Sequence, residues 1–77
     1  MEATKEVIQG VEWVAIAWVN SDEVSKIVAE SLAQSGILSA SEGSLIYAVE
    51  VPKADYVLAI KKLKQEPKLK GKWIRFN

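Results

Sequence analysis

The fold class is decided by residues 12–36, which read EWVAIAWVNSDEVSKIVAESLAQSG. The first eight residues form an apolar run of strand length that carries one charge and no turn-forming residue. In residues 20–36 the apolar side chains recur at helical spacing, between a helix start signal and a terminal glycine. A buried strand that leads directly into an amphipathic helix predicts a β-α unit.

The strand is apolar on both of its faces. Strict alternation would direct Trp13, Ala15, Ala17 and Val19 to one side of the sheet, and Val14, Ile16 and Trp18 to the other. A strand with one solvent-exposed face should instead alternate apolar with polar residues. We therefore expect this strand in the centre of a sheet, with both faces covered.

The helix has recognisable signals at both ends. Asn20 or Ser21 can accept hydrogen bonds from the first free N–H groups, and Asp22 lies near the positive end of the helix dipole. Gly36 can take the left-handed conformation that ends a helix. These signals predict one helix that begins after residue 20 or 21 and stops before Gly36.

The remaining chain supplies three more strands and a second helix. We expect a short strand at 37–40, a hairpin turn at 41–44, a strand at 45–51, a helix at 53–65 and a last strand at 73–76. The resulting β-α-β-β-α-β order predicts a ferredoxin-like α+β fold. Its four-stranded antiparallel sheet would have the order 4-1-3-2, with both helices on one face. In an alternative arrangement, residues 37–40 form only a loop of a truncated α+β relative.

Composition limits the possible chemistry. The 77 residues predict a single domain, 1–77, in which residues 1–10 form an arm or extend the first strand. The chain has no Cys and no His, which removes thiol chemistry, the usual metal ligands and the usual general base. No motif for catalysis, metal binding or phosphate binding is present, so we expect a protein that is not an enzyme and has no metal site and no cofactor. Because the start is charged and no apolar run approaches ~20 residues, we expect a cytoplasmic protein without a membrane span.

Charge is distributed unevenly although the net charge is zero. Residues 1–60 hold nine acidic and three basic residues, whereas residues 61–77 hold seven basic residues and one acidic residue. The basic residues of this second part are Lys61, Lys62, Lys64, Lys68, Lys70, Lys72 and Arg75. They would serve head-to-tail self-association or an acidic partner. Alternatively, they are lysines that keep the surface soluble and protect an edge strand.

The predicted sheet has a face that neither helix covers, and apolar residues should lie on it. The candidates for an interface there are Trp13, Ile16, Trp18, Ile46, Tyr47, Trp73 and Phe76. Large exposed apolar patches usually mark interaction sites. We therefore expect a homo-oligomer, a dimer or larger, that forms through the open sheet face or a sheet edge. In the alternative, an N-terminal arm carrying Val7, Ile8 and Val11 folds over this face.

Residues 20–37, NSDEVSKIVAESLAQSGI, resemble the first helix of ACT domains, and residues 49–51 and 56–63 are similar to that family's second half. The resemblance implies side-by-side pairing and amino-acid binding at a subunit interface. Asn20, Ser21 and Asp22 would then meet the ligand's polar groups, while Ile37 and Leu38 would line its side chain. Ser21 and Asp22 stand where the family usually has Pro-Gly. The simpler interpretation of these five residues is a helix cap followed by an edge strand.

Nucleic-acid binding is a further alternative. RNA-recognition domains share this topology and stack bases on aromatic residues of the open sheet face. Trp18, Tyr47 and Trp73 could act in this way beside the basic segment 61–75. Neither aromatic-glycine signature of that family is present, and Glu12 and Glu50 lie on the central strands. The three hypotheses are thus an association module, an ACT-like regulatory domain and an RNA- or DNA-binding domain.

Overall fold

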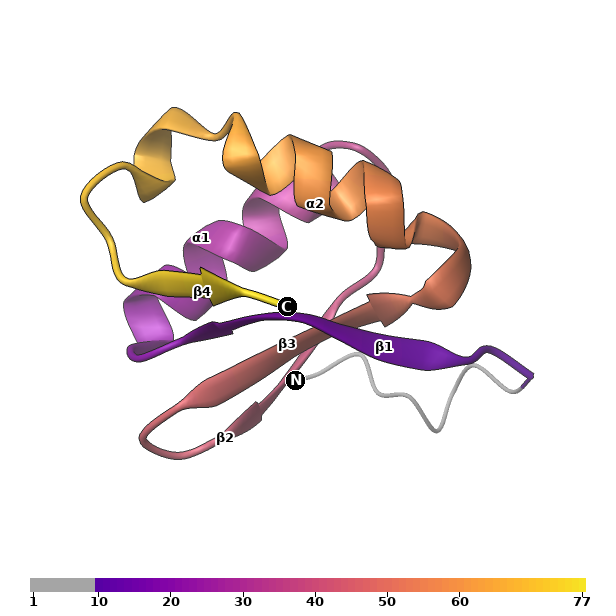
Figure 1. The fold of residues 1–77 in the computed structure, drawn as a ribbon, viewed down its shortest axis with the longest axis horizontal. Helices are drawn as coiled ribbons and strands as arrows, with labels where there is room; N and C mark the ends of the chain where they lie inside the picture. The colour runs from indigo at the N-terminus through magenta and orange to yellow at the C-terminus, as the bar shows by residue number, and fades with distance from the viewer. Residues whose placement is uncertain (1–9) are drawn as a thin grey trace.

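The computed structural model describes residues 10–77 (Figure 1). The elements are β1 (Trp13–Val19), α1 (Asp22–Ala33), β2 (Ala40–Gly43), β3 (Tyr47–Pro52), the 3-10 turn η1 (Lys53–Asp55), α2 (Tyr56–Lys64), the 3-10 turn η2 (Pro67–Leu69) and β4 (Ile74–Phe76). The predicted β-α-β-β-α-β order is confirmed. The prediction of an arm or strand extension at residues 1–10 falls, except for Gly10, outside the described residues.

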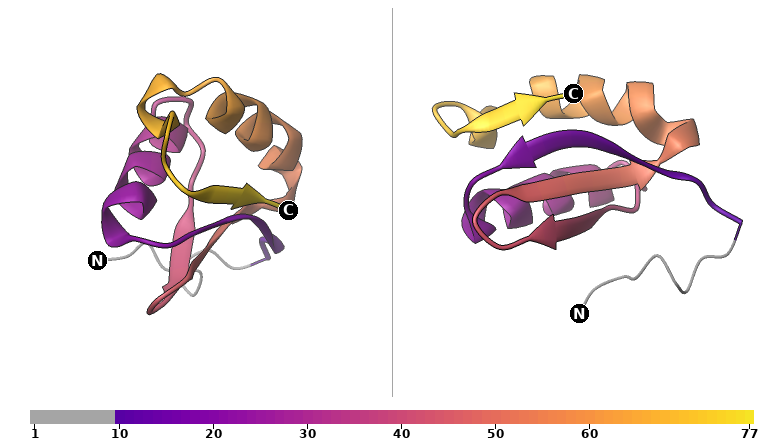
Figure 2. Two further views of the ribbon diagram at one scale, coloured as in Figure 1. Left: turned by 60° about the vertical axis from the view of Figure 1, so that its left-hand side comes forward. Right: turned by 60° about the horizontal axis from the view of Figure 1, so that its bottom comes forward.

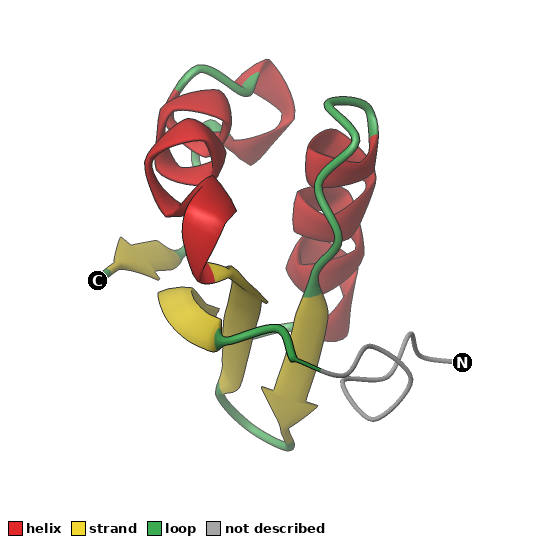
Figure 3. Cartoon of the chain, turned by 90° about the vertical axis from the view of Figure 1, so that its right-hand side faces the viewer, coloured by secondary structure: helices red, strands yellow, loops and turns green. Residues whose placement is uncertain are grey.

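The described residues form one four-stranded antiparallel sheet in the order β2-β3-β1-β4. This is the predicted order 4-1-3-2 read from the opposite edge, and β1 and β3 are central as expected. Figures 2 and 3 show α1 and α2 on the same side of the sheet. Within residues 10–77, no helix covers the opposite side, which we call the open face. The α+β class is therefore confirmed.

The α1 helix has the predicted end signals. The Ser21 side chain caps the start, because its Oγ accepts a hydrogen bond of 3.1 Å from the backbone N–H of Val24. At the other end, Gly36 has a φ of 74°. The N–H of Gly36 donates to the carbonyl of Ala33, and the N–H of Ile37 donates to that of Leu32. This pair of bonds is the Schellman pattern, which satisfies carbonyls at the helix C-terminus.

The hairpin lies later in the chain than predicted. The expected strand at 37–40 and turn at 41–44 are wrong, because Ser41, Glu42 and Gly43 pair with β3 and the turn falls at residues 44–46. Ile37 is instead buried against the end of α1. Ser41 accepts a hydrogen bond of 2.9 Å from the Ser25 hydroxyl of α1. This contact between α1 and the edge strand is long-range, so local pattern could not reveal it.

A bulge in β1 changes which residues face the helices. The pairing with β3 shifts between Ala15 and Ala17, so that Ile16 has no partner of its own. Ile16, Ala17 and Val19 are all fully buried. The two predicted sets of strict alternation are therefore mixed, because the extra residue inverts the side-chain direction of everything after it relative to everything before it.

The core fills the space between the sheet and the helices. It consists of Ile16, Ala17, Val19, Val24, Val28, Leu32, Ile37, Val49, Val51, Ala59, Leu63 and Leu69. The second α-helix is shorter than the predicted range 53–65. It begins at Tyr56 after η1 and ends at Lys64, and its Val57 side chain is 76% exposed.

Candidate interaction surface

The open face is defined by the strand registers. The residues that alternate away from the buried core positions are Trp13, Ala15, Trp18, Ala40, Glu42, Ala48, Glu50 and Arg75. Ile46, in the β2-β3 turn, and Trp73, just before β4, adjoin them. The face therefore combines tryptophan and alanine side chains with acidic residues on β2 and β3 and an arginine on β4.

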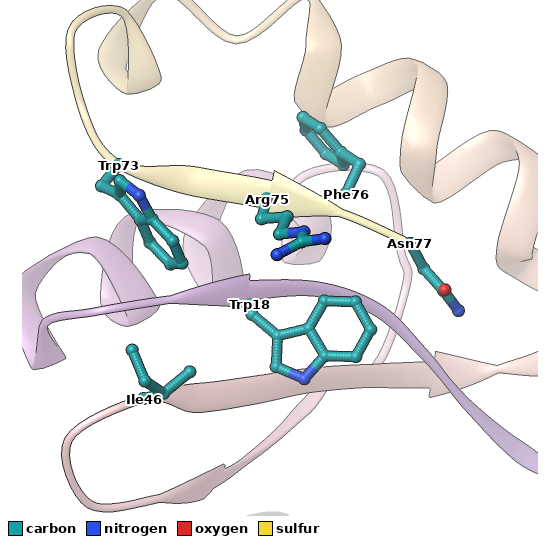
Figure 4. Close-up of a pocket in the computed structure, with 6 residues that line it drawn as sticks. All are labelled: Trp18, Ile46, Trp73, Arg75, Phe76 and Asn77. Carbon is teal, nitrogen blue, oxygen red and sulfur yellow. The ribbon is translucent and has the colours of Figure 1, made fainter.

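A shallow hollow of about 580 Å³ lies on this face (Figure 4). It is lined by Trp18, Ile46, Trp73, Arg75, Phe76 and Asn77. Trp73 is 46% exposed and Ile46 is 48% exposed, whereas Trp18 is half-buried. Exposed apolar side chains that surround a concave region form the kind of surface that binds another molecule.

The end of the chain shapes one wall of this hollow. The backbone N–H of Asn77 donates a hydrogen bond of 2.9 Å to the carbonyl of Ile16, and its side-chain Nδ2 donates one of 2.8 Å to the carbonyl of Ala15. These two bonds extend the contact between β4 and β1 beyond the bulge. They thereby hold Arg75 in register with Trp18.

The structure brings some of the predicted interface residues together and separates others. Trp18, Ile46 and Trp73 meet around the hollow. Ile16 is a correction: it is fully buried in the core, on the side of Val14, and the bulge separates it from Trp18, which lies on the open face. Tyr47 and Phe76 pack mainly against the core on the helix side, as the register with Val19 and Ala17 requires.

Trp13 lies away from the hollow, at the start of β1 opposite Pro52. Its indole N–H is covered and has no hydrogen-bond partner within residues 10–77. Most buried N–H groups do find an acceptor, so this indole is an exception among the described residues. By its position, Trp13 belongs to the open face but not to the cluster of Trp18, Ile46 and Trp73.

The predicted basic residues do not form one surface. Lys61, Lys62 and Lys64 lie on α2, on the helix side of the sheet, and the Lys64 ammonium lies 5.6 Å from the centre of the Phe76 ring. Lys68, Lys70 and Lys72 follow on η2 and the connection to β4. Among these seven basic residues, Arg75 lies on the open face, because it pairs with Trp18 across β4 and β1. The charge asymmetry seen along the sequence is thus spread over two sides of the domain.

The five residues that the ACT resemblance singles out fall into two separate groups. Asn20, Ser21 and Asp22 lie at the start of α1, where Ser21 caps the helix and Asp22 forms an ion pair of 3.3 Å with Lys26. Ile37 and Leu38 follow its end, with Ile37 buried and Leu38 48% exposed. A helix of 12 residues is about 18 Å long. One chain therefore does not bring the two groups together around a small ligand.

Two exposed apolar side chains on α2, Val57 and Leu58, were not predicted from the sequence. Val57 is 76% exposed and lines a shallow hollow of about 460 Å³, and Leu58 is 53% exposed. Helical spacing could have predicted this exposure. Adjacent residues of a helix point about 100° apart, so Tyr56, Val57 and Leu58 cannot all face the core. This group lies on the helix layer, away from the cluster on the open face.

Among residues 10–77, no group of three or more acidic, histidine or cysteine side chains is arranged to hold a metal ion. Likewise, in the part of the chain that the structure describes, none of the helices has the length and apolar character that crossing a membrane requires.

Comparison with known proteins gave no match: no family model, no curated protein and no solved structure is significantly similar to this chain. The resemblance to ACT domains therefore rests on the quoted residues alone. Any conclusion on function has to come from the surface itself.

Proposed function

We propose that this chain is a non-enzymatic association module that binds a second copy of itself through the open face of its sheet. We also infer that the fold is ferredoxin-like, which the β-α-β-β-α-β order and the sheet order β2-β3-β1-β4 support. In such a fold the helices cover one face only, and no helix of residues 10–77 covers the other face.

The observation that carries the proposal is the cluster of Trp18, Ile46 and Trp73 around the hollow of the open face. Tryptophan side chains bring a large apolar area into an interface and are enriched at its energetic centre. Covering the cluster removes apolar surface from water, and each Å² removed contributes about 25 cal/mol of favourable free energy. A second copy of the chain is the partner that is always present at the same concentration as the first.

The charge distribution favours self-association over nucleic-acid binding. A nucleic acid would need basic side chains beside the aromatic ones, because phosphate contacts supply most of the affinity. Here three of the lysines lie on α2, on the opposite side of the sheet from Trp18, whereas Glu42 and Glu50 lie on the same side as Trp18. An open face with both acidic and basic groups suits a protein surface better than a phosphate backbone.

The test is the solution mass of the whole chain by light scattering, over a dilution series and at low and high salt. We expect a dimer or larger species that persists in high salt, because added salt does not weaken apolar contacts. Trp73→Glu should shift the species to monomer. Leu45→Glu is the matched control, because Leu45 is 84% exposed at the hairpin turn and outside the cluster.

Two results would count against the proposal. A monomer at every concentration and both salts would exclude self-association, and added RNA or DNA would then be the next ligand to measure. Equal loss of the oligomer in Trp73→Glu and Leu45→Glu would show that the open face is not the contact surface.

A further inference from the structure

A single row of side chains crosses the open face from one edge of the sheet to the other. Glu42 on β2 lies opposite Ala48 on β3, Ala48 lies opposite Trp18 on β1, and Trp18 lies opposite Arg75 on β4. We call Glu42-Ala48-Trp18-Arg75 the cross-sheet row. It has an acid at one end, a base at the other, and a small residue beside a large one in the middle.

We propose that two copies pack open face to open face about a two-fold axis parallel to the strands, so that the cross-sheet rows lie over each other in opposite order. This inference rests on the proposed self-association and specifies its geometry. Rotation about that axis exchanges the two edges of the sheet. Arg75 then faces the second copy's Glu42, and Trp18 faces its Ala48.

The row is complementary to its own reversed copy in charge and in size. Each dimer gains two Arg-Glu pairs by symmetry, since an isologous contact occurs twice. An arginine and a carboxylate can form two parallel hydrogen bonds. The bulky Trp18 meets the small Ala48, which lets side chains from the two sheets interdigitate at the spacing of about 10 Å that is usual for packed sheets.

The other in-plane axis gives a poorer contact. A two-fold axis perpendicular to the strands and crossing the row would place Arg75 over Arg75, Glu42 over Glu42 and Trp18 over Trp18. Like charges would then meet at both edges, and the two largest side chains would collide in the centre. Like charges placed face to face disfavour an interface.

Arg75 is suited to an intermolecular role. Its guanidinium is exposed and makes no hydrogen bond or ion pair within residues 10–77. Glu42 is exposed on the edge strand, and a carboxylate has about four lone-pair positions, so it can accept from a second molecule in addition to its contacts within the chain.

Within one chain the two residues cannot pair. Three strand spacings separate them, which amounts to about 14 Å between backbones. That distance exceeds the Debye length of about 8 Å at physiological salt. Any strong energetic coupling between Arg75 and Glu42 must therefore arise between chains.

The test uses the whole chain in two charge-reversal variants, Glu42→Arg and Arg75→Glu, alone and mixed. Alone, each variant places like charges opposite each other at both edges of its homodimer. We expect its association to weaken by about tenfold or more. In an equimolar mixture the heterodimer has opposite charges at both edges, so a heterodimer should form with close to the affinity of the unmodified chain. Native mass spectrometry measures each species directly.

Controls separate this pairing from net charge and from folding. Glu30→Arg on α1 and Lys61→Glu on α2 make the same changes in charge on exposed helix positions. These two variants should dimerise like the unmodified chain, alone and mixed. Circular dichroism and thermal unfolding show whether each variant is folded.

The outcomes distinguish the packing from the proposed function. If the unmodified chain dimerises and both open-face variants dimerise equally well, the packing is overturned while self-association stands. If both variants weaken but the mixture does not recover, the Arg75-Glu42 contact is likewise overturned. If the unmodified chain is monomeric, the proposed function fails and the packing fails with it.

Discussion

Ser31 on α1 donates a hydrogen bond of 2.7 Å from its Oγ to Oε1 of Glu66, which precedes η2. The other carboxylate oxygen accepts a bond of 3.2 Å from the backbone N–H of Lys68. Ser31 itself is buried, with 2% of its surface exposed. The carboxylate thus ties α1 to the connection that leads into β4, the strand that carries Arg75.

The first prediction concerns the effect of pH on this link. The Ser31 hydroxyl, followed by the Lys68 N–H, holds the pKa of Glu66 below its ordinary value of 4.5. A lowered pKa in the folded state means that the ionised carboxylate stabilises the fold. That contribution is complete above the unfolded pKa and is lost as pH falls through the folded pKa.

Glu66→Gln keeps an acceptor oxygen for Ser31 but removes the charge. We expect the unmodified chain to have the larger free energy of unfolding at neutral pH, and the two proteins to converge as the pH falls below about 4.5. Urea denaturation across that range measures the difference. A difference that stays constant down to strong acid would contradict the assigned role of the Glu66 charge.

The second prediction tests the burial of Ile16 in β1. Ile16→Ala should lower the free energy of unfolding by about 2–5 kcal/mol, because it removes a fully buried side chain and leaves a cavity. Leu45→Ala, at a position that is 84% exposed, is the control and should change it by less than about 0.5 kcal/mol. Denaturant unfolding at low protein concentration measures both changes. If Ile16 lay on the open face, the two variants would lower the free energy of unfolding by similar amounts.

The third prediction concerns Gly43, the last residue of β2 before the hairpin turn. Gly43 has a φ of 140°, and a Cβ atom there would overlap the backbone carbonyl group of Ile46. Gly43→Ala should therefore destabilise the fold and disturb the β2-β3 hairpin. Gly71→Ala is the matched control, because Gly71 also has a positive φ, of 80°, but apart from Gly71 and its chain neighbours no atom of residues 10–77 lies within 4 Å of its Cβ position.

We expect Gly71→Ala to cost about 1–2 kcal/mol for backbone conformation alone, and Gly43→Ala to cost clearly more. Thermal unfolding ranks the two variants, and amide hydrogen exchange in β2 and β3 reports the hairpin. Equal melting temperatures for the two variants would show that the turn relaxes to accept the methyl group.

Local pattern predicted the number, type and order of the elements well. The apolar run before Asn20, a cap at Asn20 or Ser21 and the stop at Gly36 were each visible from residues close together in the chain, because helix ends satisfy their free backbone groups with neighbouring residues. The hairpin turn lies at residues 44–46 and not at 41–44. Alternation alone reveals neither the pairing of Gly43 with Tyr47 nor the contact of Ser41 with Ser25.

The sequence predicted that apolar residues lie on the open face, but it did not predict which residues these are. The sequence by itself determined that both faces of the central strands are apolar, so that an open sheet face would carry tryptophan side chains. Only the tertiary structure decided which ones. The bulge between Ala15 and Ala17 placed Trp18 on the open face although Ile16 lies in the core with Val14, and the registers aligned Trp18 with Arg75 and Ala48. Register depends on pairing between strands far apart in the chain, and that pairing is settled only when the whole sheet packs on its helices.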